Sequence, residues 1–319
     1  MNLRRLIYFT LAAVGIIILI IFIYRSGLYQ NPGILLSINI PVLLLAFLFT
    51  QMTIFLKIKR WQYLCVQYNF PISLRESTEV VIASFFPAGV SPGRIGDFMK
   101  ADFMKIKYSV PFRDGISMVF YERIFELIII FLVAVGILFI GFSAKYYIIL
   151  EFTLFLLIFL GVMYLFSDRF IHFFQNIARK KFRIFNSDEI KIRKISPRIA
   201  FNVSLYTILA LGCEFIRLWL VAYSFGYSLQ IIHLSIFFSL AVLIGLLSQI
   251  PIGIGITEGS LSFFLMEMGV PYEIAVGIAV IDRAISMYFV ILIGFFYYHR
   301  MRTYYVNEGE SVNNHSRIQ

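Results

Sequence analysis

Two stretches of this sequence combine helix-breaking residues with a carboxylate. One reads "FFPAGVSPGRIGDF" (85–98) and the other reads "SQIPIGIGITEGS" (248–260). Proline and glycine break a helix and leave backbone N–H and C=O groups without partners. A half-helix that restarts after such a break presents free N–H groups and the positive end of its dipole, and both suit an anionic group. The chemistry that these stretches predict is the binding of such a group.

An acid–arginine pair follows each break at nearly the same distance. Glu122 and Arg123 begin 25 residues after the acid of the first stretch, and Asp282 and Arg283 begin 24 residues after the acid of the second. Two breaks with matched spacing indicate an internal duplication, which a parallel or an inverted arrangement would satisfy equally. The recurring residues are Pro92, Gly93, Gly96 and Asp97 in the first copy and Pro251, Gly253, Gly255 and Glu258 in the second.

The surroundings of both breaks are strongly apolar. Hydrophobic residues make up 60% of the 319 residues and charged residues only 14%, against about 25% charged in soluble domains. Uncharged runs cover 6–24, 32–56 and 234–257, each close to the ~20 residues that cross a bilayer as a helix. The sequence therefore predicts an all-α polytopic membrane protein. Paired breaks at membrane depth, one in each repeat, then point to a transport site near the midplane.

Seven segments have the length and composition of full spans. The short apolar segments 78–90 and 256–268 are too brief for ordinary spans and fit re-entrant or broken helices, so we expect seven or eight crossings in total. We expect one membrane domain, 1–302, with repeat halves at 34–141 and 199–298, followed by a disordered polar tail at 303–319. The predicted full spans are 5–24, 34–56, 117–141, 146–167, 199–223, 230–250 and 274–298.

Basic residues predict the orientation. The segment 168–198 carries nine Lys and Arg residues against three acids, whereas the connection at 224–229 carries none. The positive-inside rule then places the N-terminus, the 57–113 region and the basic loop 168–198 in the cytoplasm. The expected location is the cytoplasmic membrane, with multiple passes. Trp61, beside three basic residues, is expected to anchor the chain at the cytoplasmic surface.

Several ionisable side chains fall inside the predicted spans. Each costs about 2.5–3.5 kcal/mol on insertion scales, so it normally faces a cavity or a partner. Arg123 and Arg283 recur in both repeats, which favours a functional role. The alternative is that each pairs with the acids of the other repeat and locks the two halves together. Glu214 and Arg217 lie three residues apart within one span, and a structural and a functional pair are equally open there.

Motifs for metals, nucleotides and hydrolysis are absent from the sequence. Two cysteines, Cys65 and Cys213, give neither a disulfide framework nor metal-binding spacing. "GIGITEG" resembles a dinucleotide fingerprint, but Glu258 occupies the third glycine position and no βαβ unit surrounds it. We expect no cofactor and no metal, and nothing indicates an ATP-driven pump or a hydrolase. The net charge of +10 reflects membrane topology and does not indicate nucleic-acid binding.

The two breaks carry a resemblance to a known family. "SPGRIGDFMKA" with its downstream Glu-Arg, and "IPIGIGITEGS" with its downstream Asp-Arg, resemble the lysylphosphatidylglycerol synthase transmembrane-region family. This flippase-like family includes YbhN/AglD-type and UPF0104-like membrane proteins. The resemblance covers about 5–300. Asp97 stands where the family more often has Glu, and Ile252 stands where a Gly often follows the Pro.

The resemblance implies a lipid translocator. Best-known family members join this region to a soluble aminoacyl-transferring domain, which this chain lacks, so we expect no lysyl transfer and no enzyme. The alternatives are a membrane-embedded transferase that uses Asp97 with Glu122, or an accessory scaffold for a lipid-modifying enzyme. Expected partners are membrane lipids, either a phospholipid or a polyprenyl-linked sugar, and a lipid-modifying enzyme or glycosyltransferase.

Within that expectation, the two arginines of the repeat receive the lipid phosphate. The carboxylates contact a cationic or hydroxyl-rich head group, or take up a proton that drives exchange. The expected lipid-binding residues are Arg123, Arg283, Asp97, Glu122, Glu258, Asp282, Arg94, Gly93, Gly96, Gly253 and Gly255.

Overall fold

The computed structural model describes residues 3–27, 30, 32–136, 193 and 195–315, and these residues contain helices and no strand. The all-α architecture expected from composition is thereby confirmed. The expected span 146–167 and nearly all of the basic loop 168–198 lie outside the described residues, so the total of seven or eight crossings stays a prediction.

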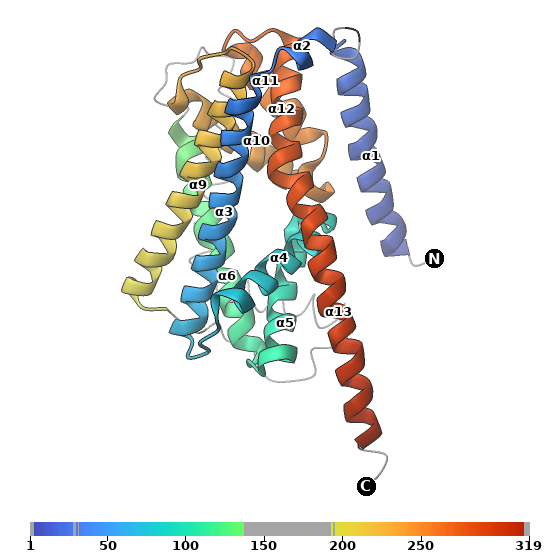
Figure 1. Cartoon of the computed structure of the whole chain (residues 1–319), viewed down its shortest axis with the longest axis vertical. Helices are drawn as coiled ribbons and strands as arrows, with labels where there is room; N and C mark the ends of the chain where they lie inside the picture. The colour runs from blue at the N-terminus through green and yellow to red at the C-terminus, as the bar shows by residue number, and fades with distance from the viewer. Residues whose placement is uncertain (1–2, 28–29, 31, 137–192, 194, 316–319) are drawn as a thin grey trace.

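The first half of the chain runs from a peripheral helix to a broken hairpin and a long helix (Figure 1). Its elements are α1 (Leu3–Arg25), α2 (Pro32–Leu36), α3 (Ile40–Gln67), α4 (Leu74–Val90), the 3₁₀ turn η1 (Pro92–Phe98), α5 (Met99–Tyr108) and α6 (Phe112–Val135).

The second half repeats this pattern. Its elements are α9 (Pro197–Ser224), α10 (Ile231–Leu247), the 3₁₀ turn η4 (Pro251–Gly253), α11 (Ile256–Glu267), α12 (Tyr272–Arg283), the π-helical turn η5 (Ala284–Tyr288) and α13 (Phe289–His315). The polar tail from 303, expected to be disordered, continues α13 to His315, because the backbone keeps its helical hydrogen bonding beyond the apolar segment.

Helix α3 differs from the span expected at 34–56. It begins at Ile40, because the Asn39 side chain accepts a hydrogen bond from the Val42 amide at 3.3 Å and Pro41 occupies the first turn. It then continues eleven residues past the predicted end to Gln67, because Lys57 and Arg60 turn inward to protein partners. With α9 and 272–303, α3 is one of three described helices long and apolar enough to cross a membrane.

Helices α3 and α9 pack antiparallel along their whole length. The Asn39 amide at the start of α3 donates to the Ser224 carbonyl at the end of α9 over 2.9 Å. At the opposite end, the Tyr68 hydroxyl donates to the Arg193 carbonyl over 3.1 Å. Their outer faces expose large apolar side chains, among them Leu48 and Ile208, as expected for contact with lipid.

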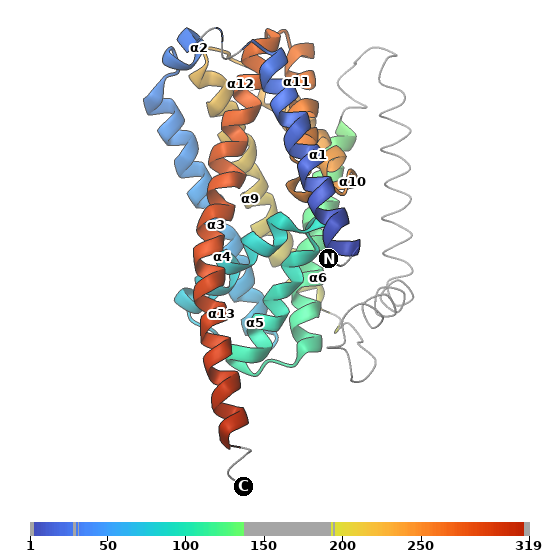
Figure 2. The ribbon, with the colours of Figure 1, turned by 90° about the vertical axis from the view of Figure 1, so that its right-hand side faces the viewer.

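Two re-entrant hairpins fill the space beside this pair. Helix α4 starts with a Ser73–Glu76 capping box, whose backbone hydrogen bond lowers the pKa of Glu76. It rises from the lower end to mid-height, and α5 returns to the same end (Figure 2). Helices α10 and α11 enter from and return to the upper end (Figure 2). The stretch 230–250, expected as a full span, is therefore one arm of a hairpin, because the Pro–Gly break at η4 turns the chain back.

The two halves are inverted repeats. Helices α3 and α9 each have 28 residues, and α4 and α10 each have 17. A 3₁₀ break, a short helix and a long helical segment follow in both halves. Because α3 and α9 run in opposite directions, the second hairpin enters from the end opposite to the first (Figures 1 and 2). Of the two arrangements that the sequence allowed, the structure has the inverted one.

Candidate functional site

The first break turns sharply at the tip of the α4–α5 hairpin. Gly93 and Arg94 both adopt left-handed backbone conformations, with φ of 57° and 58°. The Ser91 hydroxyl accepts a hydrogen bond from the Gly96 amide at 2.7 Å, which closes the turn. A Cβ on Gly96 would collide with the Pro87 carbonyl of α4, so only glycine allows this close approach. The turn places Asp97, at 0% exposure, in the protein interior.

The second break is held by side chains of its own repeat. Ile252 has a left-handed backbone with φ of 63°, and Arg283 Nη2 donates to its carbonyl over 2.7 Å. Glu258 Oε2 accepts from the Gly255 amide at 2.7 Å, at the first turn of α11. The prediction that Glu258 lies where a half-helix starts is therefore confirmed. The Glu258 carboxylate accepts a hydrogen bond from the amide that the break exposes, and its negative charge interacts favourably with the positive end of the α11 dipole.

The tips of the two hairpins contact each other. A Cβ on Gly93 would lie 2.9 Å from Gln249 Oε1, beside the second break. Both tips reach mid-height from opposite ends (Figure 2). The two breaks therefore form one junction.

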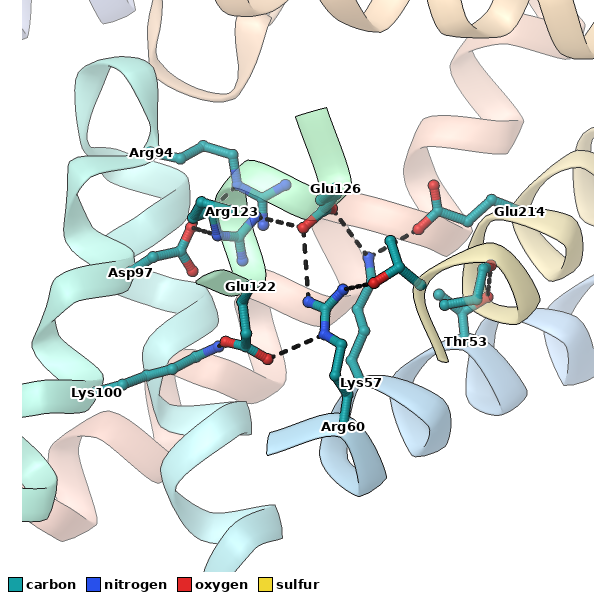
Figure 3. A network of polar contacts seen from close by, with 12 residues as sticks. Thr53, Lys57, Arg60, Arg94, Asp97, Lys100, Glu122, Arg123, Glu126 and Glu214 are labelled. Carbon is teal, nitrogen blue, oxygen red and sulfur yellow. Dashed lines mark hydrogen bonds and ion pairs between the residues drawn. The ribbon is translucent and has the colours of Figure 1, made fainter. Parts of the chain in front are cut away.

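Glu122 of α6 lies at the centre of a buried charge network beside this junction. Arg60 Nε of α3 donates to Glu122 Oε1 over 3.1 Å, and Lys100 Nζ of α5 donates to Glu122 Oε2 over 2.7 Å (Figure 3). All three side chains are at most 2% exposed. One carboxylate thus pairs with two buried cations and joins α3, α5 and α6.

Glu126, one turn further along α6, connects this network to α9. Arg123 Nη1 donates to Glu126 Oε2 over 2.8 Å, and Arg60 and Lys57 lie 3.7 and 3.8 Å from its oxygens. Lys57 in turn donates to Glu214 Oε1 of α9 over 2.8 Å (Figure 3). This Lys57–Glu214 bond crosses between the two repeats.

Asp97 completes the network at the junction. Its Oδ2 lies 3.1 Å from Arg123 Nε and 3.5 Å from Arg94 Nε. Neither oxygen accepts a hydrogen bond from another described residue, although the side chain is completely buried. Asp97 is therefore held by two guanidinium groups through charge alone.

The second repeat pairs its charges separately. Arg217 of α9 makes a two-pronged contact with Asp282 of α12, Nε to Oδ1 at 2.8 Å and Nη2 to Oδ2 at 3.2 Å. Arg283 Nε and the Tyr288 hydroxyl donate to Glu258 Oε1 over 3.1 and 2.7 Å.

The structure changes two expectations about pairing. Arg123 and Arg283 bond acids of their own repeats, so the alternative in which each bonds the other repeat's acids is wrong. Glu214 and Arg217, three residues apart, take the separate partners Lys57 and Asp282, because each points to a different neighbouring helix.

Of the predicted site residues, Arg94, Asp97, Glu122 and Arg123 come together in one network at the first break. Glu258 and Arg283 come together at the second break, and Asp282 lies apart with Arg217. Gly93 and Gly96 shape η1, while Gly253 and Gly255 shape η4 and the start of α11 with φ of 67° and 80°.

Sequence reasoning missed Lys57, Arg60 and Lys100, which it treated as cytoplasmic flanking charges. The three-residue spacing of Lys57 and Arg60, which puts both on one face of α3, is the signal that could have found them. Trp61 was expected as a surface anchor and is instead 0% exposed. The extended α3 directs its ring inward, and Lys100 Nζ lies 5.0 Å from the ring centroid.

The arrangement suits a ligand that carries charge. Metal binding has no candidate here: no cluster of three His, Cys, Asp or Glu ligands occurs within the described residues. Guanidinium groups at the junction can bind a phosphate by two-pronged hydrogen bonds, and the neighbouring carboxylates can accept from hydroxyl or ammonium groups.

Comparison with known proteins agrees with these features. The family model described as the lysylphosphatidylglycerol synthase TM region matches residues 9–294. The chain is 23% identical to the UPF0104 membrane protein PH1989 of Pyrococcus horikoshii, over 90% of this chain and 95% of that protein. It is 20% identical to MJ1595 of Methanocaldococcus jannaschii, over 84% and 87%. A UPF0104 protein of Methanothermobacter thermautotrophicus is 36% identical over 92 residues, which are 29% of this chain and 28% of that protein.

Proposed function

Because this chain belongs to the lysylphosphatidylglycerol synthase transmembrane-region family, we propose that it is a lipid translocator. Its substrate is a phospholipid or a lipid-linked sugar, which it moves across the cytoplasmic membrane. The observation that carries this proposal is the junction of two inverted, re-entrant hairpins beside a buried charge network.

Inverted broken hairpins fit the crossing of a bilayer by a polar head group. Each break leaves irregular backbone at membrane depth, which is stable only when protein or water covers it. Two such units that enter from opposite ends give equivalent access from both leaflets, and substrate sites in transporters lie at such junctions. The network beside the junction can provide charged partners for a head group within the bilayer interior, where the surrounding lipid tails are apolar.

The basic residues favour an orientation with the lower end of Figure 1 in the cytoplasm. Lys105 and Lys107 lie in the last turn of α5 and Arg113 lies in the first turn of α6. Arg193 precedes α9, and Arg198 lies in its first turn. The upper connection between α9 and α10 carries no charge. With this orientation, the α4–α5 hairpin opens from the cytoplasmic side and the α10–α11 hairpin from the outer side.

A transferase is the alternative that the sequence left open, with Asp97 and Glu122 as acid and base. In the structure, Glu122 already accepts from Arg60 and Lys100, and Asp97 faces two arginines. Both carboxylates are thus already occupied as partners of buried cations, which suits charge pairing better than acid–base catalysis. Product formation from a lipid-linked donor by the purified protein would reverse this preference.

The proposal is tested by reconstitution into liposomes that contain a fluorescent phosphatidylglycerol or a fluorescent polyprenyl-phosphate sugar. Dithionite bleaches the label in the outer leaflet, and translocation makes the inner-leaflet label accessible as well. We expect the wild-type protein to increase the bleached fraction and Arg123→Ala to reduce this increase. Arg75→Ala is the matched control, because that arginine is 80% exposed on α4 and lies away from the junction. Wild-type liposomes that bleach like protein-free liposomes with both lipids would contradict the proposal.

A further inference from the structure

The charge network at the first break does not balance. The network has five cations and four carboxylates. The cations are Lys57, Arg60, Arg94, Lys100 and Arg123. The carboxylates are Asp97, Glu122, Glu126 and Glu214. With every group ionised, these nine described residues have a net charge of +1. An uncompensated charge within a membrane protein is costly, so the network favours the arrival of an anion.

The surplus charge lies at Arg94. Lys57, Arg60 and Lys100 each have a carboxylate oxygen within 3.1 Å, whereas the ion pair of Arg94 with Asp97 has an Nε–Oδ2 distance of 3.5 Å. Arg94 is also the most exposed cation of the network, with 26% of its side chain accessible. Its left-handed backbone, φ 58°, places it at the tip of η1, where the two hairpins meet. A non-glycine residue in this conformation is energetically unfavourable and is frequently found at functional sites.

Arg123 offers a second donor at the same place. Its Nε is buried and has no hydrogen-bond acceptor among the residues that the structure describes, although Asp97 Oδ2 lies 3.1 Å away. Asp97 lies beside the Nε atoms of both Arg94 and Arg123 (Figure 3). Asp97 is therefore the shared counter-ion of two arginines, and no hydrogen bond within the described part of the chain holds its two oxygens there.

The second repeat shows no such surplus. Arg217 has Asp282, and Arg283 has Glu258 together with the Ile252 carbonyl. Each of these arginines has a dedicated carboxylate, and Arg283 is only 7% exposed. Although the fold is duplicated, the described ion pairs leave a surplus positive charge in the network at the first break and none at the second.

We infer that Arg94 and Arg123 bind the anionic phosphate of the substrate, and that Asp97 is the counter-ion which this phosphate displaces. The site takes a phosphate monoester or diester, through two guanidinium groups that can each donate two hydrogen bonds. Arg283 has a different role: it holds the second break through Ile252 and Glu258. This inference rests on the proposed function and assigns the phosphate to one of the two repeats.

The test is calorimetric titration of the full-length protein in phosphatidylcholine nanodiscs. One arm uses dihexanoyl-phosphatidylglycerol and the other uses inorganic phosphate. We expect Arg94→Gln to weaken binding of the lipid about tenfold, the effect of about 1.4 kcal/mol. Arg94→Lys keeps the surplus charge and is expected to retain more affinity than Arg94→Gln. Arg75→Gln, the exposed control, is expected to bind as the wild type does.

Asp97→Asn gives the sharpest result, because the expected change is a gain. Removing the competing carboxylate frees the Arg94 guanidinium and the Nε of Arg123, which keeps Glu126 as its other partner, so the lipid should bind several-fold more tightly than to the wild type. A structural role for Asp97 predicts weaker binding instead, and that outcome would overturn its assignment as the displaced counter-ion. If Asp97→Asn does not fold, the comparison of Arg94→Gln with Arg94→Lys still decides the phosphate site.

The remaining outcomes test the phosphate site and the proposed function separately. Equal affinity of Arg94→Gln and wild type overturns the inference, as does binding of inorganic phosphate without binding of the lipid. If the wild type translocates lipid but lipid binding does not depend on Arg94, the phosphate site is wrong and the proposed function is still supported. If lipid binding depends on Arg94 but neither labelled lipid is translocated, the proposed function is wrong and the phosphate site is still supported.

Discussion

Arg60 Nε donates to Glu122 Oε1 over 3.1 Å, and the two side chains are 2% and 0% exposed. The bond joins α3 to α6 midway between two apolar cores. Along α6, Met118 belongs to the lower core and Phe131 to the upper core, with Glu122 between them. Lys100 also donates to Glu122, so this one carboxylate is the shared partner of two cations that are each only 2% exposed.

Removing the charge of Glu122 should destabilise the protein strongly. In Glu122→Gln, Arg60 and Lys100 remain buried and lose their common partner, and breaking a buried ion pair in this way costs about 3–5 kcal/mol. The measurement is thermal unfolding in detergent followed by circular dichroism. Glu79→Gln is the control, because the Glu79 side chain is 17% exposed and its partners Lys107 and Arg75 can turn to water. Equal melting temperatures for the two variants would show that Glu122 does not contribute more to stability than the partly exposed Glu79 does.

Gly96 and Gly212 should respond in opposite directions to alanine. A methyl group at Gly96 would collide with the Pro87 carbonyl, so Gly96→Ala must separate η1 from α4 and should lower stability by several kcal/mol. Gly212 lies within α9 with nothing within 4 Å of its added methyl group, so Gly212→Ala should stabilise the helix by about 0.5–1 kcal/mol. The comparison uses melting temperatures of the two purified variants, and a Gly96→Ala protein as stable as wild type would show that η1 is packed differently.

The position of the breaks was predictable from the sequence, because proline and glycine act locally. The spacing of Asp97 to Glu122 and of Glu258 to Asp282 also revealed the duplication. The placement of Glu258 at the start of a half-helix followed from the same local rules, since a capping acid and its amide are neighbours in sequence.

The partners of the charges were not predictable in the same way. Arg217 and Asp282 are 65 residues apart, and Lys57 and Glu214 are 157 residues apart. In a sequence, a lysine that ends a hydrophobic run has the same pattern whether it faces water or turns inward. Lys57 and Lys100 were therefore assigned to the cytoplasmic surface. The inverted direction of the repeats likewise depends on how α3 and α9 pack, which no local pattern encodes.

Ile252→Gly should raise stability. A β-branched residue at φ 63° is strained, and glycine adopts this conformation without cost. We expect a gain of about 1 kcal/mol, the scale of the left-handed penalty for a residue with a Cβ. Ile254→Gly is the matched control at φ −55°, where the same change should lower stability. Melting temperatures that fall in both variants would mean that contacts of the Ile252 side chain outweigh the strain.

The inverted arrangement predicts which residues are accessible from each side of the membrane. Ser109 follows α5 at the lower end and Ser228 lies between α9 and α10 at the upper end, and both are exposed. In a background with Cys65→Ala and Cys213→Ala, a membrane-impermeant maleimide should label Ser228→Cys in intact cells. It should label Ser109→Cys only in inverted membrane vesicles. Labelling of both positions from the same side would exclude the inverted topology.

The central claim is that lipid passes at the junction of the two breaks, where Gly93 faces Gln249. The most direct measurement is liposome translocation by a Gly93→Cys, Gln249→Cys variant that lacks Cys65 and Cys213, with the new pair joined by a short thiol cross-linker cleavable by reductant. The free-thiol form supplies the control for folding. We predict that this form translocates the fluorescent lipid, that cross-linking stops translocation, and that the reductant restores it. Translocation that continues unchanged in the fully cross-linked protein would contradict the account.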